Sequence, residues 1–142
     1  MTNFYSLTVK EVKRETAESV SILFDVPVDL ESKFVFIQGQ YITLRTEIHG
    51  EDLRRSYSIC SCPYGKELRV AVKQIPDGKF STYLNTTLKV SDKIDVMPPL
   101  GNFFTEIDVH NEKNYAAFAS GSGITPIMSI IRATLKAEPK ST

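Results

Sequence analysis

The sequence has few of the residues that build metal sites or disulfide frameworks. Only two cysteines occur among its 142 residues, Cys60 and Cys62. A disulfide between residues this close would be strained, and two thiolates without a further cysteine or a well-placed histidine make a poor metal site. We therefore expect two reduced thiols, at least one of them partly buried, and no bound metal.

The sequence also lacks an excess of positive or negative charge. Lys and Arg together number 17, and Asp and Glu together also number 17. A chain with this balance has no overall field that would attract nucleic acid or an acidic surface. We therefore expect no nucleic-acid partner.

Long apolar runs are absent as well. No apolar run follows a basic patch at the N-terminus, so we expect no signal peptide. The longest apolar stretches, residues 115–119 and 124–131, are too short to span a bilayer. These absences favour a soluble, cytoplasmic protein without membrane contact. His49 and His110 lie in polar, turn-like surroundings, and we expect both at the surface.

Alternating apolar residues dominate the first hundred positions. Turn signals rich in Pro, Gly and Asp separate the alternating segments, which is typical of an antiparallel barrel rather than a βαβ sheet. We expect one helix among them, over residues 79–88. The segments predicted to be strands are residues 6–12, 19–26, 40–44, 55–59, 67–72 and 93–97.

The pattern changes after residue 104. A polar stretch leads to a continuous apolar segment at 115–119, then to a Gly-rich turn and to apolar residues at helical spacing, Ile127, Ile130, Ile131 and Leu135. This strand–turn–helix order is typical of the opening of a parallel α/β domain. One such unit cannot form a sheet alone, so we expect residues 1–104 to be a complete barrel domain and residues 105–142 a fragment of a second domain.

The predicted strand at 55–59 contains the sequence Arg55-Ser56-Tyr57-Ser58. Alternate side chains share a face of a strand, so Arg55 and Tyr57 are expected on one face and Ser56 and Ser58 on the other. A guanidinium beside a flat ring suits a ligand that has both a phosphate and an aromatic system, as a flavin nucleotide does. An ordinary cross-strand pair of Arg and Tyr is the alternative.

The sequence Gly78-Lys79-Phe80-Ser81 lies where a helix is predicted to begin. The first N–H groups of a helix have no intrahelical acceptor and can bind an anion such as a pyrophosphate. A plain chain turn, with Ser81 in the first helical turn, is the alternative. A phosphate anchor here in addition to Arg55 favours FAD over FMN.

Gly121-Ser122-Gly123-Ile124-Thr125-Pro126 follows the apolar segment. It is similar to a dinucleotide-binding fingerprint, but Pro126 stands where the third glycine would be. Proline is well tolerated in the first turn of a helix because its missing N–H costs nothing there. The acidic residue that would choose between NADH and NADPH lies about twenty residues further on in such folds, past Thr142, so the choice stays open.

The order of these motifs, together with Val70-Ala71-Val72-Lys73 and Pro98-Pro99-Leu100-Gly101-Asn102-Phe103, resembles the ferredoxin–NADP reductase superfamily. Within it, the chain most resembles the reductase subunits of phenylacetyl-CoA oxygenases (epoxidases). The resemblance covers the whole chain. It implies an all-β six-stranded FAD-binding barrel with one short helix, followed by the first strand and helix of an α/β nicotinamide-binding domain.

The resemblance also implies a role for each motif. Arg55 would bind the flavin phosphate, Tyr57 would lie against the isoalloxazine ring, and Ser58 would hydrogen-bond near its N5 edge, which makes Tyr57 and Ser58 the candidate catalytic residues. Phe103 is a candidate for stacking on the adenine, although a core position is the alternative. Val72 and Lys73 would contact the flavin largely through their backbone, although a solvated strand charge is the alternative for Lys73. The remaining residues expected to bind FAD or the nicotinamide nucleotide are Ser56, Gly78, Lys79, Phe80, Ser81, Gly121, Gly123, Thr125 and Pro126.

By the same resemblance, NAD(P)H would supply electrons, and an oxygenase component or an iron–sulfur protein would accept them. A plant-type 2Fe-2S cluster needs four spaced thiolates, which Cys60 and Cys62 do not provide, so the cluster is expected only in a C-terminal region outside this chain. We expect the chain to be the N-terminal part of a longer enzyme and to be poorly active alone. Two alternatives stay open: a flavin module serving another acceptor (a dioxygenase, a flavohaemoglobin or a dihydroorotate dehydrogenase), and a flavin-free interaction module.

Overall fold

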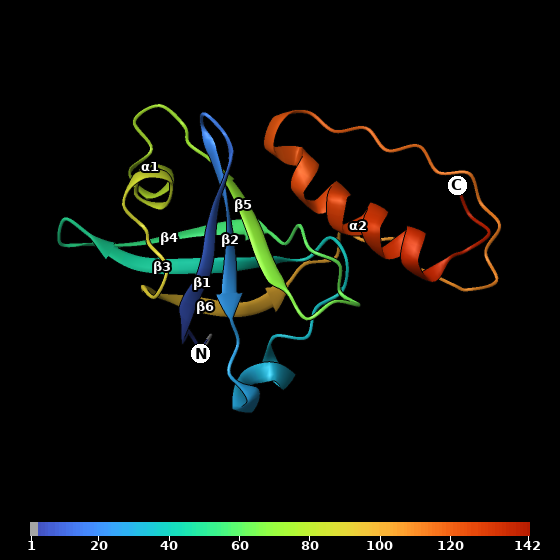
Figure 1. The fold of residues 1–142 in the computed structure, drawn as a ribbon, viewed down its shortest axis with the longest axis horizontal. Coiled ribbons are helices and arrows are strands. Elements are labelled where there is room, and N and C mark those ends of the chain that lie inside the picture. The colour runs from blue at the N-terminus through green and yellow to red at the C-terminus, as the bar shows by residue number, and fades with distance from the viewer. Residues whose placement is uncertain (1–2) are drawn as a thin grey trace.

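Six antiparallel strands form the body of the computed structural model, which describes residues 3–142. They lie in the order β4-β3-β6-β1-β2-β5, as Figure 1 shows. The predicted six-stranded antiparallel fold with one short helix is therefore confirmed. Residues 1 and 2, which the expected first domain includes, lie outside the described part. The strands are β1 (Tyr5–Thr16), β2 (Ser19–Asp25), β3 (Tyr41–Ile48), β4 (Glu51–Ser58), β5 (Leu68–Lys73) and β6 (Lys93–Leu100).

The two edge strands of this sheet, β4 and β5, come together where the chain leaves β4. Ile59 forms an antiparallel bridge with Val70 of β5. The N–H of Cys60 then donates to the carbonyl of Arg69 at 2.9 Å. These contacts curl the sheet toward closure, so that one face becomes the inside of a barrel.

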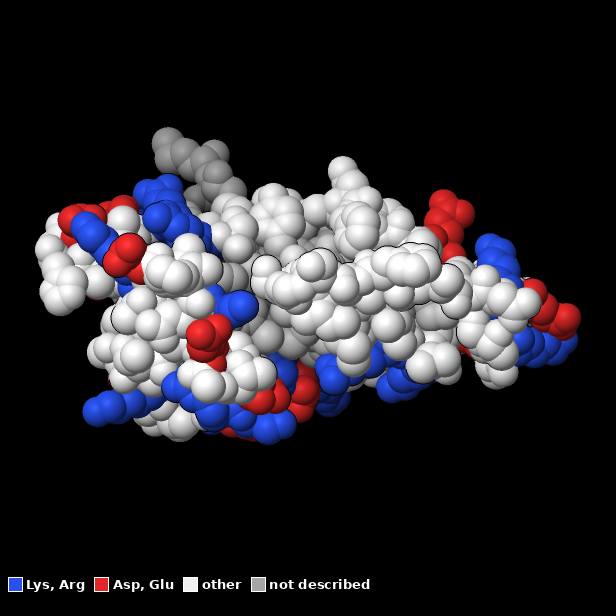
Figure 2. Space-filling model, turned by 90° about the horizontal axis from the view of Figure 1, so that it is seen from above, with Lys and Arg blue, Asp and Glu red and all other residues white. Residues whose placement is uncertain are grey.

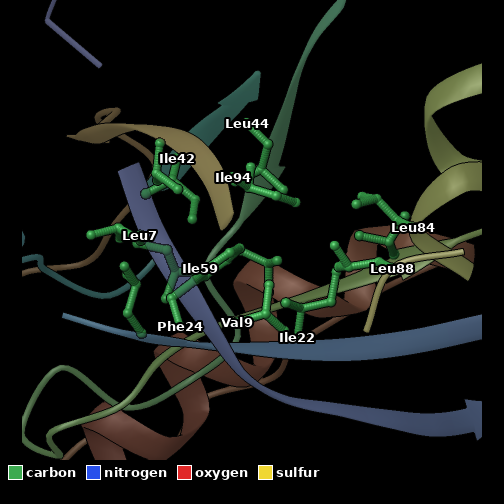
Figure 3. Close-up of a cluster of buried hydrophobic side chains, with 14 of the residues drawn as sticks. Leu7, Val9, Ile22, Phe24, Ile42, Leu44, Ile59, Leu84, Leu88 and Ile94 are labelled. Carbon is green, nitrogen blue, oxygen red and sulfur yellow. The ribbon is translucent and has the colours of Figure 1, made fainter. Parts of the chain in front are cut away.

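The inside of the barrel is filled by residues at alternate strand positions. Leu7 and Val9 on β1 and Ile22 on β2 are each at most 1% exposed. Such alternation places one set of side chains on one face of the sheet, and that face is apolar here. Figure 3 shows strand residues meeting Leu84 of the helix and Leu88 just after it.

Two helices and two short 3₁₀ turns complete the fold. The helix α1 (Lys79–Thr86) buries Phe80 and Leu84, which lie one turn apart, against the barrel. The second helix, α2 (Ile124–Ala137), is joined by hydrogen bonds to the chain that follows β4, at the other end of β4 from α1 (Figure 1). The 3₁₀ turns are η1 (Val28–Lys33) and η2 (Gly121–Gly123). None of the helices in residues 3–142 has the length and hydrophobicity needed to cross a membrane.

Residues 115–119 were predicted to be a strand, and this detail is wrong. The segment pairs with no strand among the described residues, and its side chains are exposed, Phe118 to 90%. A parallel strand needs neighbours to satisfy its backbone groups and to cover both faces, and no strand in residues 3–142 lies beside this segment. The helix that follows it does form as expected.

Glu138, at the C-terminal end of α2, holds the segment that leads to residues 115–119. Its carboxylate is 1% exposed and accepts hydrogen bonds from the Nδ2 of Asn111, the hydroxyl of Tyr115 and the Oγ of Ser141, at 2.7 to 2.9 Å. The N–H of Asp108 donates at 3.2 Å. These bonds, that of Asn111 foremost, lower the pKa of Glu138 to about 2, although burial opposes the shift.

The cysteines and histidines lie where the sequence predicted. Cys60 is buried and Cys62 is half-buried, and both are free thiols. Burial raises the pKa of the Cys60 thiol, while the charges of Arg132 and Arg69 oppose the rise. His49 and His110 are exposed.

Candidate functional site

A cavity of about 480 Å³ lies between β4, the start of α1 and the start of α2. Its walls contain parts of four motifs that the sequence analysis singled out, those at residues 55–58, 70–73, 78–81 and 121–126, which are up to 71 positions apart in the chain. The motif at residues 98–103 does not reach it. The residues that line it are Arg55, Ser56, Tyr57, Ser58, Ala71, Lys73, Ile75, Gly78, Lys79, Phe80, Ser81, Ser122, Gly123, Thr125 and Pro126.

Strand β4 supplies the first wall. Arg55 is exposed, and its Nη1 donates to the carbonyl of Arg54 at 2.6 Å, which leaves other N–H groups of the guanidinium for a ligand. Tyr57 is half-buried and packs against the core. Its ring centroid lies 6.2 Å from that of Phe80, with 33° between the planes. The Oγ of Ser56 pairs with the Oγ1 of Thr43 across the β3–β4 ladder at 2.9 Å.

The surroundings of Tyr57 extend the pH range over which its phenol stays neutral. Burial raises its pKa to about 12, and the charge of Arg55 opposes that rise. Burial disfavours the phenolate because the low-polarity surroundings solvate a charge poorly. Tyr57 can therefore both donate and accept a hydrogen bond at neutral pH.

The turn that opens α1 supplies the second wall. Gly78 precedes the helix, and a Cβ atom placed there would lie 2.6 Å from the Oγ of Ser81 and closer still to the Cγ1 of Ile75. Only glycine therefore fits this position without displacing its neighbours. The N–H groups of the first helical turn have no acceptor within the helix, and Lys79 and Phe80 of that turn line the cavity.

Ser81 is partnered within this turn. Its hydroxyl donates to the carbonyl of Gly78 and accepts from the N–H of Ile75, both at 3.2 Å, and the residue is 6% exposed. These bonds fit the alternative that Ser81 stabilises the turn. The same bonds fix the shape of the cavity wall, because they join Ser81 to Gly78 and to Ile75, which lies two residues after β5.

Strand β5 lines the cavity with Ala71 and Lys73. Val72 is 1% exposed and points into the barrel, so its side chain does not line the cavity. Its carbonyl accepts from the Nδ2 of Asn85 at 3.2 Å. The Nζ of Lys73 lies 3.8 Å from a carboxylate oxygen of Glu18.

The turn before α2 forms the third wall. Ser122, Gly123, Thr125 and Pro126 line the cavity, whereas Gly121, at a φ of 54°, lies outside it. The Oγ1 of Thr125 donates to the carbonyl of Ser122 at 2.9 Å and fixes the turn. No charged residue occurs between positions 114 and 131, and the middle of the view in Figure 2 is correspondingly free of charged side chains.

Polar side chains of α2 fasten this turn to the barrel. Ser129 is fully buried, and its Oγ donates to the carbonyl of Ser61 at 2.7 Å. Arg132 donates from Nη1 to the carbonyl of Cys60 at 2.9 Å. Both acceptors lie just after Ser58, so the position of α2 is tied to the end of the strand that carries Arg55 and Tyr57.

Sequence reasoning missed several residues of the site. Ala71, Ile75 and Ser122 line the cavity, and Asn85 holds α1 against β5. Ala71 could have been found from its place next to Lys73 and Ser122 from its place between two glycines. Ile75 and Asn85 carry no sequence signal of their own, because tertiary packing alone brings them to the site. Phe103, the candidate for adenine stacking, is 60% exposed and does not line the cavity.

Comparisons with known proteins identify the family of the chain. Residues 6–105 match the family described as the oxidoreductase FAD-binding domain. The chain is 43% identical over 141 residues to a subunit of the 1,2-phenylacetyl-CoA epoxidase of Escherichia coli (strain K12), covering 99% of this chain and 40% of that protein. It is 37% identical over 131 residues to the ferredoxin reductase component of a 3-ketosteroid-9-alpha-monooxygenase of Rhodococcus rhodochrous, covering 91% of this chain and 36% of the relative.

Among solved structures, the chain is similar to the flavohem-like FAD/NAD binding domain of nitric oxide dioxygenase from Vibrio cholerae O1 biovar El Tor. The TM-score is 0.72 at 27% identity, over 92% of this chain and 56% of that one. The chain thus spans well under two thirds of the relatives it matches. The matched family, the barrel and the motifs gathered in one cavity lead to one conclusion: the chain belongs to the oxidoreductase FAD-binding domain family, of the ferredoxin–NADP reductase type.

Proposed function

We propose that this chain is the FAD-binding part of an NAD(P)H-dependent oxidoreductase that delivers electrons to an oxygenase. The observation that carries the proposal is the cavity of about 480 Å³ that β4, the Gly78 turn and the turn before α2 enclose together. Its size lies within the range of small-molecule sites, about 300–1,000 Å³. Its walls offer cations, free helix N–H groups and an aromatic ring, which is the set of groups that a flavin nucleotide requires.

The phosphate end of the cofactor would lie between Arg55 and the start of α1. Arg55 can bind phosphate oxygens with two parallel N–H groups, and the N-terminus of α1 offers backbone donors beside it. Gly78 itself carries no side chain, and Ile75 and Ser81 fill the space where its Cβ would lie, so the turn is closely packed beside these donors. Lys79 adds a second cation, whose Nζ lies 2.6 Å from Glu51.

The isoalloxazine end would lie toward Tyr57 and Ser58. Tyr57 presents an aromatic face held by Phe80, and its neutral hydroxyl can hydrogen-bond the ribityl chain. Ser58, half-buried at the end of β4, would hydrogen-bond at the N5 edge of the ring. When bound, FAD would supply hydride and single-electron chemistry, while these residues hold and orient it.

The turn before α2 would bind the nicotinamide nucleotide. Gly123, Thr125 and Pro126 face the same cavity as Tyr57, and Gly121 would shape the turn from outside it. We propose that residues 105–142 form the first part of a nicotinamide-binding domain and that residues 1–104 form the FAD domain. The bonds from Ser129 and Arg132 to the chain after Ser58 would keep the nicotinamide turn facing the flavin.

For the acceptor, we propose an iron–sulfur centre, in a region of the intact protein outside this chain, and then an oxygenase of the phenylacetyl-CoA type, in a cytoplasmic pathway of phenylacetate breakdown. The 43% identity to a component of the phenylacetyl-CoA epoxidase supports this choice. A second candidate is a reductase for another acceptor, because flavohemoproteins are 33–37% identical to this chain.

The test is a pair of assays. Anaerobic mixing of the FAD-loaded protein with NADH or NADPH should bleach the visible flavin absorption. The intact reductase should then support turnover of a phenylacetyl-CoA oxygenase and not of a flavohaemoglobin haem domain or a steroid monooxygenase. Turnover with one of those acceptors and none with the phenylacetyl-CoA oxygenase would favour the second candidate. A matched variant, Ser58→Ala, should slow the bleaching without changing FAD affinity by more than about twofold.

A further inference from the structure

The turn at residues 38–40, just before β3, lies against the chain that connects β6 to the α2 part of the molecule. Gln38 is only 6% exposed, although it is a polar residue outside every helix and strand. Its Nε2 donates to the carbonyl of Thr105 at 2.7 Å, across 67 positions of the chain. A buried side chain of the barrel therefore holds the residue at which the proposed nicotinamide-binding part begins.

The rest of the turn contacts the same connection. Gly39 has a φ of 86°, and a Cβ atom there would overlap the carbonyl oxygen of Phe103 and lie 3.4 Å from the Cδ1 of Ile130 on α2. The backbone of the turn therefore packs closely against the connection, and only glycine fits there. The Nε2 of Gln40 donates to the carbonyl of Gly101 at 3.2 Å.

The backbone of residues 102–107 has no other secondary structure to hold it. Within residues 3–142, this segment forms no backbone–backbone hydrogen bond. The side chains of Phe103 and Phe104 are 60% and 41% exposed. Gln38 thus supplies a hydrogen bond to a segment that lacks the bonds of a sheet or a helix.

The two ends of the connection differ in this respect. Gly101 directly follows β6, which pairs with β3 as far as its last residue and ends on the side of the barrel that faces α2 (Figure 1). The bond from Gln40 is therefore added to a position that the sheet already sets. The sheet does not reach Thr105, so the direction in which the chain leaves the barrel depends on Gln38.

The same turn also contacts the flavin strand. The carbonyl of Gln40 accepts from the N–H of Ile59, the first residue after β4, at 2.9 Å. Next to it, α2 is joined to the chain after β4 by the bonds of Ser129 and Arg132. The start of α2, which lines the cavity, is thus placed by two sets of contacts, those bonds and the contacts of the turn at 38–40.

We propose that Gln38 is a positioning residue for hydride transfer, in which the nicotinamide is oxidised as the flavin takes up two electrons. By holding Thr105, it keeps the turn before α2 facing Tyr57 and Ser58. The inference rests on the proposed function, because it concerns the step between the two cofactors. A displacement of about 1 Å between reacting groups can slow a reaction about a hundredfold, so the loss of one such bond has a large kinetic effect.

The experiment compares Gln38→Leu with its matched control, Gln40→Leu. Leucine is close in size to glutamine but donates no hydrogen bond, so the first variant releases Thr105 and the second releases Gly101. Residual dipolar couplings of the flavin-free chain measure the orientation of α2 relative to the barrel. Anaerobic stopped-flow mixing of the intact, FAD-loaded reductase with NADH or NADPH measures the rate of flavin bleaching, and fluorescence titration measures FAD affinity.

In Gln38→Leu, the couplings of α2 should no longer fit the wild-type orientation, and bleaching at saturating nucleotide should slow at least about tenfold. FAD affinity should stay within about twofold of wild type, because Arg55 and the Gly78 turn are untouched. Gln40→Leu should keep the orientation of α2 and bleach within about twofold of the wild-type rate. Gln38→Asn, whose amide is one carbon too short to reach Thr105, should behave as Gln38→Leu does.

The outcomes separate this inference from the proposed function. A wild-type reductase whose flavin is bleached by neither nucleotide overturns the proposed function and this inference with it. Bleaching of Gln38→Leu at the wild-type rate, unchanged couplings, or an equal slowing in Gln40→Leu overturns only the role of Gln38. Thermal unfolding shows whether each variant is folded, and Gln38→Asn decides the matter if Gln38→Leu is not.

Discussion

Arg14 and Asn85, which lie 71 positions apart in the chain, are joined by two hydrogen bonds. The Nη1 of Arg14 donates to the Oδ1 of Asn85 at 3.0 Å, and its Nη2 donates to the carbonyl of Asn85 at 2.6 Å. Asn85 is 4% exposed and donates in turn to the carbonyls of Val72 and Ser81, at 3.2 and 2.9 Å. One side chain thus ties β1, β5 and α1 together beside the proposed phosphate site.

Because of these hydrogen bonds, which we call the Arg14–Asn85 clasp, substituting Asn85 should lower both the stability of the fold and the affinity for FAD. Asn85→Asp keeps the acceptor for Arg14 but loses the donors to Val72 and Ser81, and it should lower the free energy of unfolding by about 1–3 kcal/mol because buried carbonyls lose their partners. FAD affinity should fall as well, because α1 is no longer held at the turn. Urea unfolding and flavin titration measure the two effects.

Arg14→Lys is the matched comparison for this clasp. It keeps the charge but loses the paired geometry, so it should cost less stability, about 0.5–1.5 kcal/mol, and should change FAD affinity less than Asn85→Asp. Wild-type stability and wild-type FAD affinity in Asn85→Asp would show that the clasp does not position the turn.

The close packing around Gly78 leaves no room for a larger residue at this position. Gly78→Ala places a Cβ 2.6 Å from the Oγ of Ser81, so the turn must shift and the bonds of Ser81 must lengthen. We expect a loss of about 1–3 kcal/mol of unfolding free energy and a marked loss of FAD affinity. Thermal unfolding and flavin titration measure the two losses.

Gly123→Ala provides the control for this substitution. A Cβ added to Gly123 would have no neighbouring atom within 4 Å, and the residue lies at a φ of −61°, so alanine fits there without strain. Its unfolding free energy should stay within about 0.5 kcal/mol of wild type. Equal behaviour of the two alanine variants in thermal unfolding would contradict the close packing at Gly78.

Tyr57 should make the folded state sensitive to alkaline pH. Its pKa is raised to about 12 by burial, whereas an unfolded chain has the ordinary value near 10. Between these values the unfolded state loses the proton first, so stability is unaffected below about pH 10 and falls as the pH rises toward 12. Tyr57→Phe should remove part of this fall, measured as unfolding free energy against pH. An identical alkaline slope in the variant would contradict the assignment.

Glu138 should act at the opposite end of the pH scale. Its pKa in the folded state is about 2, below the ordinary value of 4.5, so the stabilisation that it provides is present above pH 4.5 and is lost as the pH falls toward 2. Glu138→Gln should mimic that loss at neutral pH. Hydrogen exchange should then become faster at residues 105–115, which Glu138 holds, and stay unchanged in β1 and β2. Unchanged exchange throughout would show that the carboxylate does not order this segment.

Much of the fold could be predicted because its signals are local. Alternating residues such as Val9 and Ile22 fill the barrel, and Phe80 and Leu84 at helical spacing mark α1. The strand bounds shift by a few residues, most in β1, β3 and β4, because a ladder continues as long as a partner strand is present. Residues 115–119 failed as a strand for the same reason, since pairing depends on a neighbour that the segment itself does not contain.

The candidate site could be predicted only in part. The motifs of β4, α1 and the turn before α2 meet in one cavity as expected, because each has a local pattern tied to its chemistry. The side chain of Val72 points into the barrel, since it keeps the alternation of Leu68 and Val70 on β5, and its contact with the cofactor stays a prediction for the backbone alone. The contacts of Asn85 and Gln38 have no local signature, because packing between distant segments creates them.

The central claim, that the cavity beside Arg55 and Tyr57 binds a flavin nucleotide, is tested most directly by titrating the purified apo chain with FAD. Quenching of the flavin fluorescence and a shifted visible spectrum should reveal saturable binding in wild type. Arg55→Ala should weaken it by about 1.5–3 kcal/mol, the contribution of a charged hydrogen-bonding group. No binding by a folded wild-type chain, or equal affinity in Arg55→Ala, would contradict the claim.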